Sequence, residues 1–229
     1  MRLGLAIPLL NEADSVAGVV GPMHDCLNEA GVEHTIVLVN NGSTDGTREA
    51  IDALAQPDAI VPIHLRENAG YGGGILTGLA HLERDGLPDV VGWAWGDGQI
   101  APSALVPLLQ AIRTGADIAK TVRTERHDGA MRRAVTTGYA ATMRLLGART
   151  RDINGCPKLM TREAFMAIEP TSVDWFIDAE LVLTAERLGL CIAEHPVTMA
   201  RREHGESKVT ARTVAEFAKN IAAWSLRRD

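Results

Sequence analysis

The sequence predicts an α/β fold, in which a mostly parallel sheet is flanked by helices on both faces. Short apolar runs alternate with amphipathic segments through the first half of the chain, as in consecutive strand–helix units. One such run, HTIVLVN (34–40), is rich in β-branched residues, which suits a strand buried on both faces. The 229 residues fit one large α/β domain or two small ones.

The predicted elements of the first half follow in regular order. Strands are predicted at five short apolar runs, 2–7, 34–40, 60–65, 89–95 and 116–122. Helices are predicted between them, at 13–30, 44–54, 74–84 and from 102 onward. The first helix ends at Gly31, and Pro102 stands at a first turn, where proline is accepted.

The second half is less regular. Two helices and a short strand are predicted, over 129–147, 176–189 and 190–197. Residues 152–160 mix polar and apolar types and predict no element. A last amphipathic helix is predicted over 210–226, with an apolar stripe made of Val214, Phe217, Ile221 and Trp224. Because no linker or repeat interrupts the chain, we expect one domain over 1–229.

Composition excludes several classes of protein. A formal charge of −6 argues against a general nucleic-acid binder, which would be basic. The three cysteines are far apart and form no CxxC pair, which favours a reducing cytoplasm over a disulfide or zinc framework. No apolar run reaches the roughly 18–20 residues of a membrane span. Asn11 and Glu12 end the N-terminal apolar run early, so we interpret it as a strand and not a signal peptide.

Four segments with polar or glycine residues each follow a predicted strand. Ligands of such sheets bind beyond the carboxyl ends of the strands, so these segments should meet at one edge. They are IPLLNE, VNNGSTDGT, RENAGYGGG and WGDGQ.

Two of these segments favour nucleotide binding. Asn40 and Asn41 carry amides that both donate and accept, and so suit a base; the alternative is only a turn and a helix cap. The glycines around Gly70 fit neither GxGxxG nor a phosphate loop that ends in G-K-[ST]. They either let backbone approach a ligand or form a flexible turn that packs a helix.

WGDGQ favours a divalent cation. Asp97 and the Gln99 carbonyl lie two residues apart and point the same way on an extended segment. Mg²⁺ or Mn²⁺ needs only one or two carboxylates when substrate phosphates complete its shell. Trp95 occupies the place where a second metal-binding acid is expected, and we expect it to wall a sugar pocket. The alternative is a simple turn.

Two segments of the second half contain candidate catalytic and phosphate-binding residues. Asp178 and Glu180 begin an apolar helix, where either is a candidate general base or merely favours the helix dipole. RREHGESK (201–208) is a basic, glycine-containing loop that fits phosphate binding, with a solvated surface loop as the alternative.

In this order, the motifs resemble family 2 glycosyltransferases of the GT-A fold, a Rossmann-like nucleotide-binding architecture. IPLLNE resembles IPxYNE, VNNGSTDGT resembles VDDGSTDGT, and WGDGQ resembles DADGQ. RDINGCPKLMTREAF, WFIDAEL and RREHGESKV resemble three later motifs. The closest similarity is to polyprenol-phosphate mannosyl- and glucosyltransferases, and it covers roughly residues 3–209.

The resemblance implies an inverting, metal-dependent transfer of a sugar from a nucleotide diphosphate sugar. It divides the domain into a nucleotide-sugar-binding half (1–123) and an acceptor-side half (124–229). It places Asp178 near the acceptor as candidate base, and Asp97 and Gln99 on the metal. It places the remaining residues beside the nucleoside, base and phosphates: Pro8, Leu10, Glu12, Asn40, Asn41, Arg123, Arg202, Ser207 and Lys208.

The chain departs from the family pattern at informative positions. Leu10 replaces the usual Tyr, Trp95 replaces the first acid of DxD, and Pro157 replaces a Phe. Asn40 and Asn41 replace two acids that contact the base. A carboxylate pairs with the two N–H groups of guanine, whereas an amide suits the donor and acceptor of uracil or thymine. A UDP- or dTDP-sugar is therefore favoured over a GDP-sugar.

Several alternatives stay open. The acceptor is either a polyprenyl phosphate, which is already anionic, or a small soluble hydroxyl compound, which needs a base. A sugar nucleotidyltransferase is the rival enzyme, although its G-x-G-x-R start is absent. A catalytically silent nucleotide-sugar-binding protein is the rival that Trp95 suggests. We expect a cytoplasmic protein, and the last helix fits core packing, a homodimer contact or peripheral membrane binding.

Overall fold

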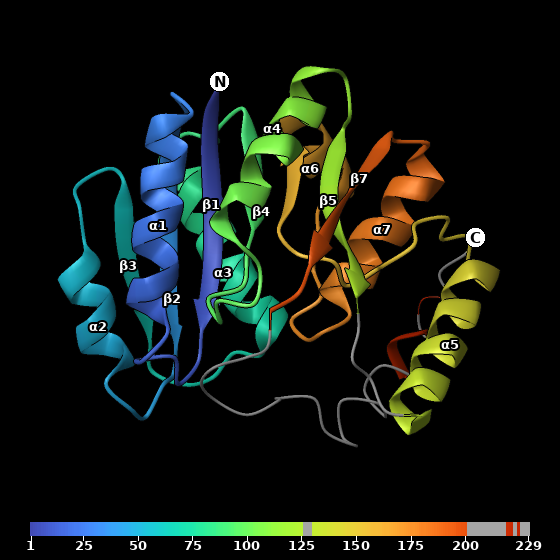
Figure 1. The fold of residues 1–229 in the computed structure, drawn as a ribbon, viewed down its shortest axis with the longest axis horizontal. Coiled ribbons are helices and arrows are strands. Elements are labelled where there is room, and N and C mark those ends of the chain that lie inside the picture. Colours follow the sequence, from blue (N-terminus) through green and yellow to red (C-terminus); the bar gives the residue numbers. More distant parts are fainter. Residues whose placement is uncertain (126–129, 201–218, 222–223, 225–229) are drawn as a thin grey trace.

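Seven strands form one sheet in the computed structural model, which describes residues 1–125, 130–200, 219–221 and 224 (Figure 1). The strands are β1 (Arg2–Leu9), β2 (Glu33–Asn41), β3 (Ile60–Leu65), β4 (Val90–Trp93), β5 (Ile118–Glu125), β6 (Lys158–Thr161) and β7 (Ile192–Thr198). Their order across the sheet is β3-β2-β1-β4-β6-β5-β7. All neighbouring strands run parallel except the two pairs that include β6, so the predicted mostly parallel sheet is confirmed.

Helices cover both faces of this sheet (Figure 1). They are α1 (Val16–Glu29), α2 (Thr47–Leu54), α3 (Tyr71–Arg84), the 3₁₀ turn η1 (Pro102–Ala104), α4 (Leu105–Arg113), α5 (Ala130–Leu145), α6 (Arg162–Ile168) and α7 (Ile177–Leu188). Apolar residues of α1, α2 and α4 form one core cluster, and those of α3, α6 and α7 form another. Because side chains alternate along a strand, Leu5 enters the first cluster and Ala6 the second.

The strand β6 and the helix α6 were not predicted. β6 is only four residues long and antiparallel to both neighbours, and it inserts between β4 and β5. It begins with Lys158, a fully buried charge that hides the apolar pattern of a strand. As a result, the two predicted halves of the chain share one sheet, because β6 and β7 come from the second half.

The other predicted elements are present with small shifts at their ends. One shift has a consequence for the site: α3 starts at Tyr71 and so contains glycines that the sequence predicts as a loop. The predicted basic loop (201–208) and most of the predicted last helix lie outside the described residues. Of its stripe, Ile221 and Trp224 pack on the cluster that includes Phe176, which favours the core interpretation. Within the part of the chain that is described, no helix is long and apolar enough to cross a membrane.

Candidate active site

The polar loops that follow β1, β2, β3 and β4 meet at the carboxyl edge of the sheet, as predicted. The backbone N–H of Asn11 donates to Ser43 Oγ at 3.0 Å, which joins the first loop to the second. Ser15 Oγ lies 3.1 Å from the Gly96 carbonyl oxygen, which brings the first loop next to the fourth. Asn41 joins the second loop to the third. This edge, formed by residues 8–15, 40–47, 66–70 and 94–101, is called the donor edge below.

Asn40 and Asn41 are both buried, and they point to opposite faces of the sheet. Asn41 Nδ2 donates to the Gly70 carbonyl at 2.8 Å, and Asn41 Oδ1 accepts the N–H of Ala69 at 2.9 Å. Asn40 Oδ1 accepts the N–H of Ser43 at 3.0 Å. The two amides therefore brace the loops of the donor edge, in addition to any contact with a base.

Position 70 requires a glycine, because the backbone of Val173 lies too close for a side chain. It has a φ of +84°, and a Cβ there would lie 2.4 Å from the Val173 carbonyl oxygen. The N–H of Gly73 donates to that same oxygen at 2.8 Å. Glycines of α3 also allow close packing on β1, since a Cβ at Gly78 would lie 2.6 Å from Ala6 Cβ. The contacts thus match the helix-packing alternative for this segment.

The other predicted nucleoside residues line the loop that follows β1. Pro8 belongs to β1 itself and lies under α3, and Leu10 follows directly. Glu12 begins the turn into α1, where Ser15 Oγ donates to its carboxylate at 2.8 Å. The Glu12 N–H donates to Thr47 Oγ1 at 2.8 Å, which keeps this loop against the start of α2.

Asp97 supplies one carboxylate at the donor edge, and its neighbour Gln99 is engaged elsewhere. Asp97 Oδ1 accepts the N–H of Gln99 at 3.1 Å. The Gln99 carbonyl accepts the N–H of Ala200 at 2.9 Å, and its side-chain amide donates back to the Ala200 carbonyl at 3.1 Å. No cluster of three or more His, Cys, Asp or Glu side chains occurs among the described residues. This set fits a cation held by one carboxylate and by the phosphates of a bound donor, and not a cation held by protein alone.

Trp95 belongs to a row of aromatic and charged side chains. Its indole N–H donates to the Tyr71 hydroxyl at 2.9 Å, and the Tyr71 ring stacks on Trp175 with centroids 4.1 Å apart. The Arg123 guanidinium lies over the Trp95 ring, 5.6 Å from its centroid. Asp152 fixes Arg123 through two hydrogen bonds of 2.7 and 2.8 Å.

The charge of Arg123 is secured by this pairing. Burial lowers the pKa of the guanidinium, but the hydrogen bonds and the charge of Asp152 outweigh it and raise the pKa above its ordinary value. Burial also raises the pKa of Tyr71 well above its ordinary value, so the Tyr71 hydroxyl stays protonated. Trp95 therefore contacts both a fixed cation and a neutral phenol, at the position where the motif DADGQ has its first acid.

Asp178 forms a buried ion pair. Lys158 Nζ donates to Asp178 Oδ1 at 2.7 Å, and the indole N–H of Trp93 donates to the same oxygen at 3.2 Å. All three side chains are at most 2% exposed. Lys158 stands in the segment DINGCPKLM, and its type and place in an apolar stretch were the only sequence signals of this pairing.

Glu180, the other predicted base, braces the loop that precedes α7. Its carboxylate accepts the backbone N–H groups of Thr171 and Ser172, at 3.0 and 2.8 Å. It also accepts the Thr171 hydroxyl at 2.8 Å. This loop carries Val173 against Gly70, so Glu180 indirectly positions the start of α3.

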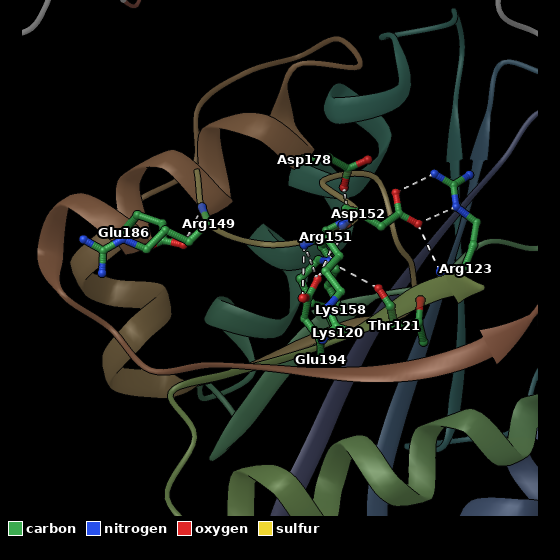
Figure 2. A network of polar contacts seen from close by, with 10 residues as sticks. All are labelled: Lys120, Thr121, Arg123, Arg149, Arg151, Asp152, Lys158, Asp178, Glu186 and Glu194. Atoms are coloured by element: carbon green, nitrogen blue, oxygen red, sulfur yellow. Dashed lines mark hydrogen bonds and ion pairs between the residues drawn. The ribbon is translucent and has the colours of Figure 1, made fainter. Parts of the chain in front are cut away.

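A second buried lysine joins the acceptor-side half to the sheet. Lys120 and Lys158 are register partners on β5 and β6, and Figure 2 shows them converging with Glu194, Asp152 and Asp178. Lys120 Nζ donates to Glu194 Oε1 at 3.1 Å, and also to the backbone carbonyls of Asp152 and Thr121. Burial, and the nearby charge of Lys158, lower the pKa of Lys120. We call Lys120, Asp152, Lys158, Asp178 and Glu194 the buried charge network.

Sequence reasoning left several residues without a role. The predicted phosphate contacts Arg202, Ser207 and Lys208 lie outside the described residues. The sequence indicates no function for four further residues, because each gains its hydrogen-bond partner from a distant segment: Asp152, Lys120, Tyr71 and His64. The sequence shows the acid Asp152 in DINGCPKLM, but it gives no sign that Asp152 pairs with Arg123.

The sequence of the chain is similar to those of known sugar-transferring enzymes. Residues 5–169 match the family model described as glycosyl transferase family 2. The chain is 32% identical to a polyprenol monophosphomannose synthase of Mycolicibacterium smegmatis, over 99% of this chain and 88% of that protein. It is 29% identical to an undecaprenyl-phosphate mannosyltransferase of Micrococcus luteus, over 99% and 95% of the two chains.

Solved structures share the fold at lower identity. A glucosyl-3-phosphoglycerate synthase from Mycobacterium tuberculosis, in complex with phosphoglyceric acid, has a TM-score of 0.74 at 20% identity, over 96% of this chain and 79% of that one. A mannosyl-3-phosphoglycerate synthase from Rubrobacter xylanophilus has a TM-score of 0.73 at 18% identity, over 100% and 75%. Another M. tuberculosis complex, with Mn²⁺ and UDP-glucose, has a TM-score of 0.72 at 19% identity, over 96% and 78%. These likenesses confirm the predicted GT-A fold.

Proposed function

This chain belongs to glycosyl transferase family 2 and is a glycosyltransferase, and we propose that it transfers a sugar to the phosphate of a polyprenyl phosphate. The donor is a nucleotide diphosphate sugar with uracil or thymine as its base. A phosphate oxygen of the acceptor attacks the anomeric carbon, and the bond from that carbon to the nucleotide's β-phosphate oxygen breaks. Its electron pair leaves with the nucleoside diphosphate, and the configuration at the anomeric carbon inverts.

The hydrogen-bond partners of the two candidate bases, Asp178 and Glu180, indicate which kind of acceptor the enzyme uses. Asp178 is locked to Lys158 and Trp93, and the Glu180 carboxylate is engaged by three donors. A hydroxyl acceptor must lose a proton during attack, whereas a phosphate monoester is already an anion near neutral pH. Neither candidate is placed as a ready base, so a phosphate acceptor is favoured over a small hydroxyl compound. Relatives that cover nearly the whole chain are named for polyprenyl phosphates.

On the donor edge, each group has a proposed task. Asn40 and Asn41 contact the base, Pro8, Leu10 and Glu12 adjoin the nucleoside, and Trp95 walls the sugar. Arg123, held by Asp152, faces the diphosphate together with Arg202, Ser207 and Lys208. Asp97 is the residue that would hold Mg²⁺ or Mn²⁺, with Gln99 next to it. A divalent cation supplies positive charge that stabilises the departing diphosphate.

We further propose that the chain is one domain, cytoplasmic, and associated with the membrane surface only peripherally. A lipid-linked phosphate lies at the bilayer surface, so a chain whose described helices include no membrane span would meet it there. The division into a donor half (1–123) and an acceptor half (124–229) follows the sequence. Both halves contribute strands to the same sheet, which holds the donor edge and the buried charge network in fixed relation.

A transfer assay with three acceptors tests the proposal. Radiolabelled UDP-sugars and dTDP-sugars would be offered with undecaprenyl phosphate, undecaprenol or 3-phosphoglycerate, each with and without Mn²⁺. Label should enter the organic phase only with undecaprenyl phosphate. Transfer to undecaprenol or to 3-phosphoglycerate alone would contradict the assigned acceptor. Tight donor binding without any transfer would favour a silent binding protein, and release of pyrophosphate would favour a nucleotidyltransferase.

A further inference from the structure

Asn40 is joined through His64 to Asp52, a residue of α2. Asn40 and His64 are register partners on the parallel strands β2 and β3, so their side chains lie on the same face of the sheet. The Asn40 side-chain amide nitrogen lies 3.4 Å from His64 Nδ1. On the other side of the ring, His64 Nε2 lies 2.9 Å from Asp52 Oδ1. The three side chains thus form a chain of contacts from the surface to the donor edge.

The direction of each hydrogen bond follows from the groups themselves. An ionised carboxylate only accepts, so His64 Nε2 carries the proton that Asp52 binds. In the neutral ring, Nδ1 is then an acceptor, and it takes an N–H of the Asn40 amide. At the other end of this amide, the backbone N–H of Ser43 only donates, and Asn40 Oδ1 accepts it at 3.0 Å. A rotation of the amide by 180° would oppose two donors at Ser43 and two acceptors at His64.

These contacts leave a defined recognition surface on Asn40. An amide has two N–H groups and two oxygen lone pairs, and the contacts within the described part of the chain use one of each. One donor and one acceptor remain, in a fixed orientation. The edge of uracil or thymine offers an N–H beside a carbonyl oxygen, whereas cytosine offers an acceptor beside an amino group. Uracil and thymine carry their N–H between two carbonyl oxygens and so pair with an amide in either orientation, whereas cytosine has one such pair and needs one orientation. An amide that rotates freely would serve both kinds of base, and an amide fixed in the other orientation excludes cytosine.

We propose that His64, held in one tautomer by Asp52, is a positioning residue that fixes the Asn40 amide and thereby selects uracil or thymine over cytosine. The inference rests on the proposed function, because it concerns the base of the donor. Stability alone does not account for the arrangement. Asp52 is 51% exposed, and a contact to a charge so accessible to water contributes little to folding.

Equilibrium binding of UDP and CDP tests the inference without an acceptor. Calorimetry would compare the wild type with His64→Leu, which removes the ring acceptor, and with His64→Gln, whose amide can still accept from Asn40 and donate to Asp52. The matched control is His81→Leu, because His81 of α3 and Asp85, which follows the end of α3, form a similar pair, 3.3 Å apart. Dissociation constants of both nucleotides would be measured for each protein.

The expected result is a change in the ratio of the two affinities. The wild type and His81→Leu should prefer UDP by about tenfold, the discrimination expected of a bidentate contact. In His64→Leu the ratio should fall by about three- to tenfold, which corresponds to one hydrogen bond. In His64→Gln the ratio should stay within about twofold of the wild type, because one acceptor replaces another.

Three outcomes would overturn the inference, and they differ in what they leave standing. If His64→Leu weakened UDP and CDP equally, His64 would be merely structural, and the proposed function would survive. A wild-type preference for CDP would contradict the orientation of Asn40, again without harm to the proposed transfer reaction. If the wild type bound neither nucleotide, the inference and the proposed function would both be wrong.

Discussion

The donor edge and the buried charge network hold their polar groups in different ways. At the donor edge, neutral amides and hydroxyls make hydrogen bonds between neighbouring loops, as Asn41 does with Gly70. In the network, full charges are removed from water and paired across elements far apart in sequence, as Lys158 is with Asp178. A neutral contact can be lost at modest cost, whereas removal of one charge leaves its partner buried and unpaired. The donor edge should therefore tolerate the loss of one contact better than the buried charge network does.

The largest expected effect is loss of half of an ion pair in the network. Lys158→Met should lower the free energy of unfolding by about 3–5 kcal/mol, because Asp178 would keep a buried charge without its partner. The double variant Lys158→Met/Asp178→Leu should be much closer to wild type, since both charges are gone. Urea unfolding of the three proteins measures this. A double variant as unstable as the single one would show that packing, and not charge, holds this region.

A smaller effect is expected where the network meets the donor edge. Asp152→Ala should cost about 1.5–3 kcal/mol in stability, because Arg123 loses its charged hydrogen-bond partner. Arg123 would also be free to move away from Trp95, so UDP should lose more affinity than uridine does. Calorimetry with both ligands checks this. Equal losses for uridine and UDP would argue against a role for Arg123 at the diphosphate.

A pH effect is expected far from both regions, at His34. Burial, together with the nearby charge of His24, lowers the pKa of His34, although its hydrogen bond to the Val32 carbonyl opposes this. The unfolded chain therefore binds a proton more readily than the folded one, and stability should decline as pH falls below about 6.5. Urea unfolding at pH 7.5 and 5.5 would show this decline, and His34→Gln should make it shallower. An unchanged slope would assign the decline to other groups.

The smallest effect is expected for a surface ion pair. Arg162 Nη2 lies 2.9 Å from Asp89 Oδ1, and these side chains are 41% and 52% exposed. Arg162→Ala should change stability by no more than about 1 kcal/mol, because water screens the pair. A loss as large as that of Lys158→Met would break the comparison between exposed and buried charges.

Sequence predicted the donor edge well because its signals are local. Glycines, amides and the acid of WGDGQ follow apolar strands directly, and parallel strands must end at one edge. The network escaped prediction because its partners are distant: Arg123 and Asp152 are 29 positions apart, and Lys158 and Asp178 are 20 apart. The sequence does not predict β6 for the same reason, since a strand that begins with a buried lysine is recognisable only when its carboxylate partner is known.

Some predicted residues have different surroundings from those expected. Gln99 is engaged by Ala200, and Glu180 by the loop of Thr171 and Ser172, so each already has a structural task. Both were chosen from residue type and spacing, which show what a side chain is able to do. Which partner the side chain contacts in the folded protein depends on the tertiary structure.

The central claim is that the acceptor's phosphate oxygen attacks the sugar, and ³¹P NMR of the purified product tests it most directly. With undecaprenyl phosphate as acceptor, we predict that the lipid's monoester signal is replaced by that of a phosphodiester to the anomeric carbon. A product that keeps its phosphate monoester and carries the sugar on a hydroxyl would contradict the account.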